Sequence, residues 1–404
     1  MAHTPSALWL PFTQMGEFEP SDRTFVRAEG NYLFDATGRR IFDAVSSIWT
    51  TVHGHCHPYI VEQITRQAAT LDHSTLLGAT NPVAEELAAR LTQLTRTDHA
   101  FFSSDGASAI EVALKIAIQY WQNAGEPQRT RFVHLVDAYH GDTAGAMSVS
   151  DIALFKSRFA PLTFETIAYG EVTRALDSPD VAALIVEPIV QAAAGIRIVP
   201  HSAYARFKHI SPLLIVDEVA TGFGRTGTLF ASEQLDIEPD IVCVGKGITG
   251  GTLALSATLV RERVYAAFLG NHAQRRHLFH GHSYAGNPIA CAAALANLEL
   301  FVTERTLEAV ASAARAISVA LERTRAKRLV REVRQAGLMI GIELRAEEIA
   351  ARGASAAWDV ADAMYARGYF TRPIGDTVQL VPPLSSTSGE LCDFLAALDE
   401  TLGP

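Results

Sequence analysis

The 404-residue sequence has few cysteines, no block of basic residues and no long apolar run. Its four cysteines are scattered without a CxxC spacing, which predicts reduced thiols and no disulfide framework. No stretch approaches the roughly 20 apolar residues of a membrane helix, and the first residues lack the features of a signal peptide. A formal charge of −10 is unsuited to binding nucleic acid. We therefore expect a cytoplasmic enzyme without nucleic-acid or membrane partners.

Three kinds of pattern follow one another along the chain. Residues 1–58 include a predicted meander of short strands, "TFVRAEGNYLFDATGRRIFDAVS". Residues 59–305 alternate apolar, strand-like runs with helical stretches, as in a sheet covered on both faces. Residues 306–404 alternate helices with strands, and Thr387 with Glu390 fits a capping box at the last helix. The sequence predicts a large α/β domain with a mainly parallel sheet and a smaller α+β domain, against which the N-terminal segment packs.

Two groups of residues suited to ligand binding or catalysis directly follow predicted strands, which is where open α/β sheets bind ligands. After "AFFSSD", Gly106 and Ala107 begin a helix whose first amides favour an anion such as phosphate. An ordinary strand-to-helix turn would have the same pattern. After "LLIV", Asp217 can accept a charge-assisted hydrogen bond from a heterocycle nitrogen, or it can be a capping or solvated carboxylate.

A third group is Lys246, which ends another apolar strand. Full burial lowers the pKa of a lysine by up to about 3–5 units, which suits Schiff-base chemistry, whereas a lysine that reaches solvent would have no such role. A phosphate cradle, an aspartate for a ring nitrogen and a lysine for an aldehyde are together what pyridoxal 5'-phosphate requires. Tyr139 adds an aromatic ring at the same end of the sheet.

Nearly the whole chain resembles the class III, pyridoxal-phosphate-dependent aminotransferases. The resemblance rests on the stretches "LWLPFTQM", "SSIWTTVHGH", "DGASAIEVALK", "YHGDTAGAMSVSD", "VEPIVQ", "VDEVATGFGRTG", "GKGITGG", "HGHSYAGNP" and "RPIGD". It implies a transferase of fold type I that works as a homodimer with shared active sites. Asp142, where many relatives have Arg, implies the branch that converts 8-amino-7-oxononanoate to 7,8-diaminononanoate in biotin biosynthesis.

The resemblance also implies roles for single residues. Lys246 matches the lysine that binds the cofactor and moves the proton, and Asp217 matches the partner of the ring nitrogen. Arg372 matches the arginine for the distal carboxylate of the substrate, and Asp142 would face its amino group. The implied cofactor-binding residues are Gly106, Ala107, Tyr139, Asp217, Lys246, His282 and Ser283, of which the last two would approach the cofactor phosphate of the neighbouring subunit. The implied substrate-binding residues are Phe12, Ile48, Trp49, Asp142, Arg225, Gly281 and Arg372.

Three positions depart from the family pattern and leave the amino donor open. Relatives that use S-adenosylmethionine tend to have paired tryptophans where this chain has Ile48-Trp49, so lysine or another amine is an alternative donor. Phe12 replaces a frequent tyrosine, and Ala107 replaces a hydroxyl on the phosphate, a loss on the order of 1 kcal/mol. Two other activities on this fold remain alternatives, an ω-aminotransferase of specialised metabolism and an aminomutase.

The stretch "VHGHCHP", residues 52–58, raises the separate question of a metal site. His53, His55 and His57 alternate, as ligands on one face of a strand would. However, Gly54 and Pro58 would break a strand, and no carboxylate is near in the sequence. We expect no metal here and predict that the histidines make hydrogen bonds around the cofactor pocket.

Overall fold

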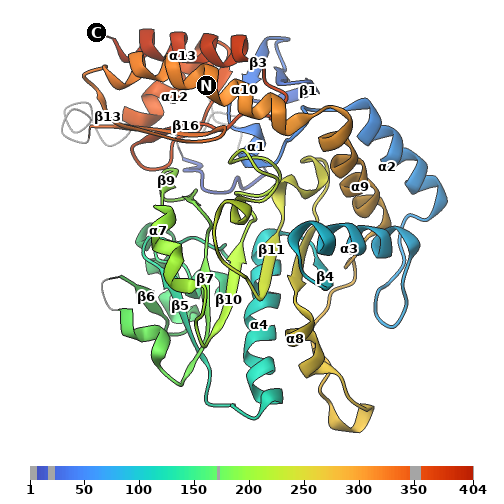
Figure 1. Cartoon of the computed structure of the whole chain (residues 1–404). Coiled ribbons are helices and arrows are strands. Elements are labelled where there is room, and N and C mark those ends of the chain that lie inside the picture. Colours follow the sequence, from blue (N-terminus) through green and yellow to red (C-terminus); the bar gives the residue numbers. More distant parts are fainter. Residues whose placement is uncertain (1–6, 17–22, 171–172, 346–355, 404) are drawn as a thin grey trace.

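The computed structural model of the chain describes residues 7–16, 23–170, 173–345 and 356–403. It has two parts, which lie one above the other in Figure 1. The lower part contains a large sheet and most of the middle of the sequence. The upper part combines strands from the beginning of the chain with helices and strands from its end. The boundaries near residues 58 and 305 remain a prediction.

A seven-stranded sheet forms the centre of the lower part, in the order β4-β12-β11-β10-β7-β5-β6. All neighbouring strands run parallel except β12, which is antiparallel to both β4 and β11. The mainly parallel sheet is therefore as predicted, with one reversed strand that the apolar runs do not reveal. The strands are β4 (His99–Ser103), β5 (Arg131–Leu135), β6 (Ile167–Tyr169), β7 (Val181–Val186), β10 (Leu213–Asp217), β11 (Ile241–Val244) and β12 (Ser256–Val260).

Helix α4 (Gly106–Ala124) begins directly after β4 and packs along the sheet. Its predicted apolar stripe is buried, namely Ile110, Ala113, Leu114, Ala117 and Trp121. The other helices of this part are α2 (Pro58–Thr70), α3 (Pro82–Thr95), α5 (Ala144–Ser148), α6 (Ala153–Lys156), α7 (His201–Tyr204), α8 (Glu262–Tyr265) and α9 (Pro288–Thr303). Among the helices of the described residues, none combines the length and the apolar character needed to cross a membrane.

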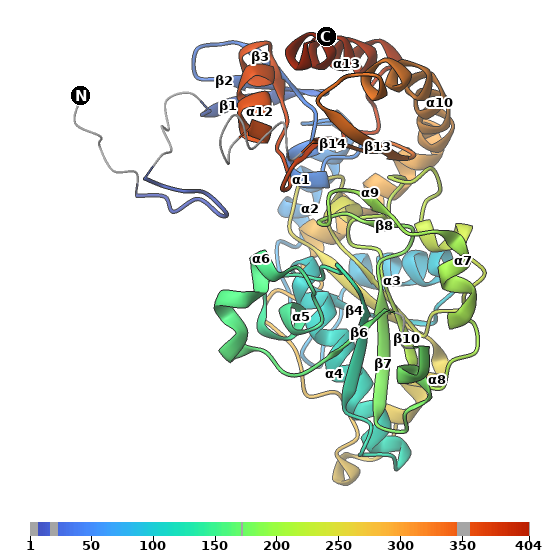
Figure 2. The ribbon, with the colours of Figure 1, turned by 90° about the vertical axis from the view of Figure 1, so that its left-hand side faces the viewer.

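The strands from the first part of the chain and the helices and strands from its last part lie together in the upper part (Figure 2). The predicted meander is present as β1 (Phe25–Glu29), β2 (Tyr32–Asp35) and β3 (Arg40–Asp43), and β15 (Tyr369–Phe370) pairs in parallel with β3. A second, antiparallel sheet has the order β13-β14-β16. Its strands and the accompanying helices are β13 (Val330–Ala336), β14 (Met339–Leu344), β16 (Thr377–Leu380), α10 (Thr306–Arg325), α12 (Ala356–Ala366) and α13 (Ser388–Leu402).

The capping box predicted for the last helix is present. The Thr387 hydroxyl accepts a hydrogen bond from the N–H of Glu390 at 3.2 Å, and the Glu390 carboxylate accepts one from the N–H of Thr387 at 2.8 Å. Two donors that the helix start would leave unpaired are thereby satisfied.

The histidine-rich segment packs against the end of α9. His57 Nε2 lies 3.0 Å and His53 Nδ1 3.6 Å from Glu304, while His55 Nε2 lies 2.9 Å from Asp43. The histidines therefore do have carboxylate partners, Asp43 and Glu304, which are not their neighbours in sequence. None of the three histidines lines the main cavity described below, so the prediction that they surround the pocket is wrong. In the described ranges, no group of three or more His, Cys, Asp or Glu residues is placed to hold a metal ion.

His53 is deeply buried in this segment, with 5% of its surface exposed. Its Nε2 lies 3.3 Å from the carbonyl oxygen of Asn297 on α9, and its ring packs edge-on against Phe301 with the centroids 5.0 Å apart. Burial lowers the pKa of His53 from 6.5 to about 4, and the nearby Glu304 carboxylate only partly opposes it. The folded chain therefore holds this ring neutral at a pH where an unfolded chain would protonate it.

We predict that His53 makes the protein less stable as the pH falls from 6.5 towards 4. In that window the unfolded chain binds a proton that the folded chain does not, so the free energy of unfolding decreases with falling pH. Urea unfolding at about pH 7 and about pH 4.5 should show that His53→Gln loses less stability than the wild type, by on the order of 2 kcal/mol. The matched control His201→Gln replaces an exposed histidine and should behave like the wild type. Equal pH dependence in His53→Gln and the wild type would contradict this account.

Candidate active site

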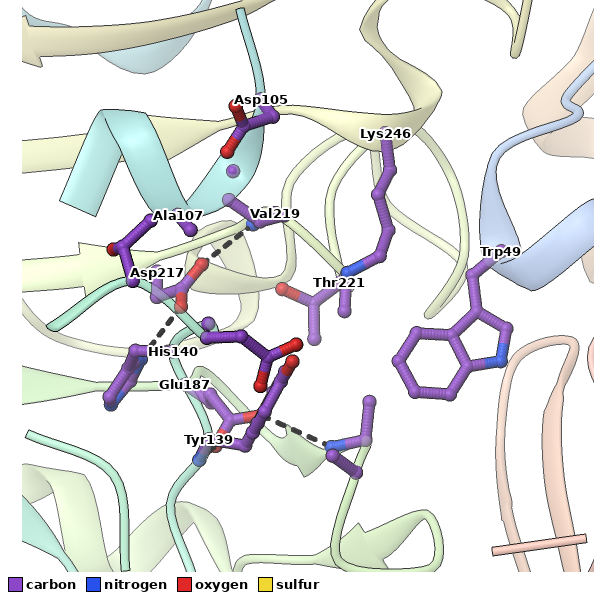
Figure 3. Close-up of a pocket in the computed structure, with 17 residues that line it drawn as sticks. Trp49, Asp105, Ala107, Tyr139, His140, Glu187, Asp217, Val219, Thr221 and Lys246 are labelled. Atoms are coloured by element: carbon purple, nitrogen blue, oxygen red, sulfur yellow. Dashed lines mark hydrogen bonds and ion pairs between the residues drawn. The ribbon is translucent and has the colours of Figure 1, made fainter. Parts of the chain in front are cut away.

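A cavity of about 510 Å³ lies beyond the carboxyl ends of the parallel strands. Asp217 is the last residue of β10, Glu187 directly follows β7, and Lys246 lies two residues after β11. All three line the cavity, together with Tyr139 from the segment after β5 (Figure 3). Parallel strands end at the same edge of the sheet, which explains why residues so far apart in sequence meet here. The volume is within the range of small-molecule sites.

Asp217 is held from both sides. Its Oδ2 lies 2.7 Å from Nδ1 of His140, and its Oδ1 accepts a hydrogen bond from the N–H of Val219 at 3.0 Å. Asp217 and His140 are 5% and 4% exposed, so both interactions are shielded from water. Nε2 of His140 has no partner among the described residues. A buried carboxylate with two donors is oriented firmly enough to serve as a fixed negative charge.

The side chain of Lys246 points towards the middle of the cavity (Figure 3). Burial lowers its pKa, with Asp217 and then Glu187 opposing the effect. Nζ lies 5.1 Å from the centre of the Trp49 ring. A lysine of lowered pKa has a larger neutral fraction near pH 7, which suits a nucleophile and a proton carrier.

The turn that carries Lys246 is fastened by helix α9. Lys246 has a positive φ of 42° and begins a single 3-10 turn, η6 (Lys246–Thr249). The side-chain amide of Asn297 donates hydrogen bonds to the carbonyl oxygens of Gly247 at 3.0 Å and Ile248 at 3.1 Å. Asn297 is fully buried. These bonds hold the backbone of the turn in which Lys246 has its left-handed conformation.

The start of α4 provides two amides for an anion. Asp105 caps the helix by accepting from the N–H of Ser108 at 2.9 Å. The amides of Gly106 and Ala107 have no hydrogen-bond partner within the described part of the chain, and both residues line the cavity. A Cβ atom at Gly106 would lie 2.5 Å from Cγ1 of Val219, so only glycine fits. The helix start is thus suited to a phosphate group.

Glu187 and Tyr139 form the wall opposite Lys246. Glu187 accepts hydrogen bonds from the N–H groups of Tyr139 at 3.0 Å and Ala192 at 3.2 Å. Burial raises the pKa of Glu187 to about 7, and Asp217 adds to the increase. Burial also raises the pKa of Tyr139, with Asp142 adding to it, so the phenol keeps its proton. Sequence reasoning assigned no role to Glu187 or His140, although both follow predicted strands, in "VEPIVQ" and "DAYHGDT".

The structure brings about half of the predicted site residues into this cavity. Those that line it are Trp49, Gly106, Ala107, Tyr139, Asp142, Asp217 and Lys246. Those that do not line it are Phe12, Ile48, Arg225, Gly281, His282, Ser283 and Arg372. Gly281 and Ser283 are exposed, and Nε2 of His282 lies 3.4 Å from Oγ of Ser104, next to the start of α4. The assignment of these three residues to a neighbouring subunit remains a prediction.

Arg372 is connected to the cavity through a row of aromatic rings. Its guanidinium lies 6.0 Å from the centre of the Phe12 ring and 5.6 Å from that of Trp358. The Phe12 ring packs edge-on against Phe155 at 5.5 Å, and Phe155 packs in the same way against Tyr139 at 5.6 Å. Among the residues that the structure describes, no carboxylate forms an ion pair with Arg372. Nη2 of Arg372 donates to the carbonyl oxygen of Phe12 at 3.3 Å, so the described residues give the cation a backbone acceptor and no carboxylate.

Arg225 does not line the cavity, contrary to the prediction. It is 1% exposed, and its guanidinium donates to the carbonyl oxygens of Pro382 at 2.6 Å and Thr51 at 2.8 Å. Burial lowers the pKa of Arg225 to about 9. The side chain joins an N-terminal segment to a C-terminal segment. Its position in "GFGRTG" does not reveal that it points away from the cavity.

Comparison with known proteins gives a family for this site. Residues 17–402 match the model of the family "Aminotransferase class-III". The chain is 40% identical to adenosylmethionine-8-amino-7-oxononanoate aminotransferase of Anoxybacillus flavithermus, over 98% of this chain and 94% of that protein. It is similar to the crystal structure of the enzyme of the same name from Methanocaldococcus jannaschii, with a TM-score of 0.92 and 37% identity over 98% and 96% of the two chains.

A second solved structure is an amine transaminase from an uncultivated Pseudomonas species in its PLP-bound form. It has a TM-score of 0.88 and 32% identity, over 98% of this chain and 99% of that one. The match to the family model extends over nearly the whole length, and the lysine, the aspartate and the helix start meet in one cavity. The chain belongs to the class-III aminotransferases and is a pyridoxal-phosphate-dependent enzyme.

Proposed function

We propose that the enzyme transfers an amino group to 8-amino-7-oxononanoate and forms 7,8-diaminononanoate in biotin biosynthesis. The amine-bearing carbon of the donor is oxidised to a carbonyl, while the ketone carbon of the acceptor is reduced to an amine. The observation that carries the proposal is a cavity with a carboxylate, Asp142, in its wall and a cation, Arg372, linked to that wall by a row of aromatic rings. The acceptor has an amino group next to its ketone and a carboxylate at its far end. Relatives at 37–40% identity bear the name of this activity.

The residues of the cavity fit pyridoxal phosphate. The amides of Gly106 and Ala107 would hold its phosphate. A side chain at position 106 would collide with Val219, which explains the glycine at this helix start. Asp217, with donors on both oxygens, would hold the ring nitrogen, and Lys246 would hold the aldehyde. When bound, the cofactor supplies an electron sink for the carbon whose proton is removed.

Lys246 is the residue that would move this proton. Its Nζ is buried with a lowered pKa, so it can accept a proton from carbon and return it to another atom. Asp217 provides a negative charge at a fixed place, because His140 and the N–H of Val219 both bind it. Glu187 holds the backbone of Tyr139, whose side chain lines the cavity.

Arg372 and Asp142 would bind the two ends of the amino-ketone. A guanidinium can form two parallel hydrogen bonds with a carboxylate, which suits recognition of the distal end. The rings of Phe12 and Phe155 provide apolar surface between Arg372 and the cavity for the aliphatic part of the substrate. Trp49 alone of the Ile48-Trp49 pair lines the cavity, and the Ile48 side chain is 39% exposed. This wall is compatible with lysine or S-adenosylmethionine as the donor.

We predict that 7,8-diaminononanoate bleaches the visible absorbance of the cofactor in the purified holoenzyme, because it is the product of a reversible reaction. S-adenosylmethionine and lysine, added separately, identify the donor as the compound that also bleaches it. Lys246→Ala should slow the reaction by about 10²–10⁴-fold, since proton transfer by a positioned side chain contributes that much.

Two results would contradict the assignment. If none of the three compounds bleached the absorbance while another ω-amine did, an aminotransferase of a different pathway would be indicated. If a single amino compound were rearranged without any keto acceptor, the enzyme would be an aminomutase. Turnover by Lys246→Ala at the wild-type rate would refute the role of the lysine.

We further predict that Arg372→Ala raises KM for 8-amino-7-oxononanoate by about 10–100-fold, because a charge-assisted hydrogen bond contributes about 1.5–3 kcal/mol. Arg372→Lys should fall between this variant and the wild type, since an ammonium replaces the guanidinium fork by a point charge. Steady-state kinetics give both values. Arg367→Ala is a matched control, because Arg367 is exposed and pairs with Glu400 on the surface. An equal increase of KM for an amine without a carboxylate would show that Arg372 does not recognise the carboxylate.

A further inference from the structure

The N-terminal segment that brings Trp49 to the cavity contains a strained turn. Four successive residues, Ser46 to Trp49, have positive φ values of 44°, 49°, 66° and 66°. They form α1 (Ser46–Trp49), and none of them is glycine. In this conformation Cβ approaches the following carbonyl oxygen too closely, so L-residues adopt it rarely and usually singly. Such strain persists only where surrounding contacts hold the segment, and it is concentrated at functional sites.

The contacts that hold this turn come mainly from β16 and the residue after it. The Ser46 hydroxyl donates to the carbonyl oxygen of Val381, and the N–H of Val381 donates to the carbonyl oxygen of Ala44 at 2.7 Å. The indole N–H of Trp49 donates to Oε1 of Gln379 at 2.9 Å. Trp49 is the only residue of the turn that lines the cavity. β16 therefore determines where this indole wall stands.

Gln379 also binds the segment that carries Arg372. Its side-chain N–H donates to the backbone carbonyl oxygen of Arg372 at 2.7 Å. Its backbone carbonyl oxygen accepts a hydrogen bond from the hydroxyl of Thr371 at 2.6 Å. Gln379 is 1% exposed and does not line the cavity. One buried amide thus joins the wall beside Lys246 to the arginine that would hold the distal carboxylate. Loss of either side-chain hydrogen bond of Gln379 would destabilise the fold, because a buried polar group without a partner costs free energy.

We propose that Gln379 is a positioning residue for substrate specificity, which sets Trp49 at a fixed separation from Arg372. This separation would select aliphatic substrates by the distance between their reacting amine and their carboxylate. This inference rests on the proposed function, because it takes Arg372 as the carboxylate site. It assigns to Gln379 no contact with the substrate.

The test compares 7,8-diaminononanoate with an aliphatic 1,2-diamine of the same chain length that has no carboxylate. The measured quantity is the ratio of kcat/KM for the two compounds, in the wild type and in Gln379→Met, which keeps the length of the side chain and removes both hydrogen bonds. We expect the ratio to fall by about tenfold, through KM for the carboxylate substrate, as loss of a hydrogen bond worth about a factor of ten predicts. A merely structural role would lower the amount of active enzyme and leave this ratio unchanged.

Gln335→Met is the matched control on the opposite edge of the same sheet. Gln335 lies on β13 of the same sheet, and its amide is also bonded at both ends, accepting from the Ser318 hydroxyl at 2.7 Å and donating to the carbonyl oxygen of Ala314 at 2.9 Å. It is not part of the cavity. The ratio in Gln335→Met should equal that of the wild type.

Two more variants keep the test decisive if Gln379→Met does not fold. Gln379→Glu retains an acceptor for the indole and loses the donor to Arg372, so it should lower the same ratio. Trp49→Phe removes the indole donor, and where Gln379→Met folds, the effects of these two variants should not add in a double-mutant cycle, because both remove the same bond. An unchanged ratio, or additive effects, would overturn the inference. Failure of the wild type itself to react with 7,8-diaminononanoate would instead refute the proposed function.

Discussion

The interaction on which the site depends is the buried contact between Asp217 and His140. A carboxylate without partners is costly to bury at the end of a central strand, and it would lose its charge. Nδ1 of His140 on one oxygen and the N–H of Val219 on the other compensate for the lost water. The negative charge of Asp217 in turn opposes the effect of burial on Lys246. The two catalytic candidates are therefore linked electrostatically through the same cavity.

Burial acts in opposite senses on the other ionisable groups of the cavity. It lowers the pKa of Lys246 and raises that of Glu187, and both changes favour the neutral form. A neutral lysine can take up a proton, and a Glu187 carboxyl with a pKa of about 7 carries less negative charge near pH 7 than an ordinary glutamate. The cavity thus avoids an excess of buried charge and still places one carboxylate where a ring nitrogen would need it.

The residues proposed for chemistry come from the large-sheet part, whereas those proposed for recognition come from both parts, with Asp142 in the former and Arg372 in the latter. The large sheet supplies Asp217, Lys246 and the start of α4, all at the carboxyl ends of its strands. The N- and C-terminal segments supply Trp49 and Arg372, and they are joined by the pairing of β3 with β15 and by the buried Gln379. This division fits the departures at Phe12 and Ile48, which lie in the same segments.

Local patterns were sufficient to predict most strands, the apolar stripe of α4, the capping box at Thr387, and Lys246 and Asp217 at strand ends. Periodicity, caps and strand ends are properties of a few neighbouring residues, so they can be read from a short window. The direction of β12, the carboxylate partners of the histidines, the burial of Arg225, the bond of His140 to Asp217 and the left-handed turn before Trp49 could not be read in this way. Each depends on contacts between residues that are far apart in sequence, and the folded chain places a side chain by packing that no local window contains.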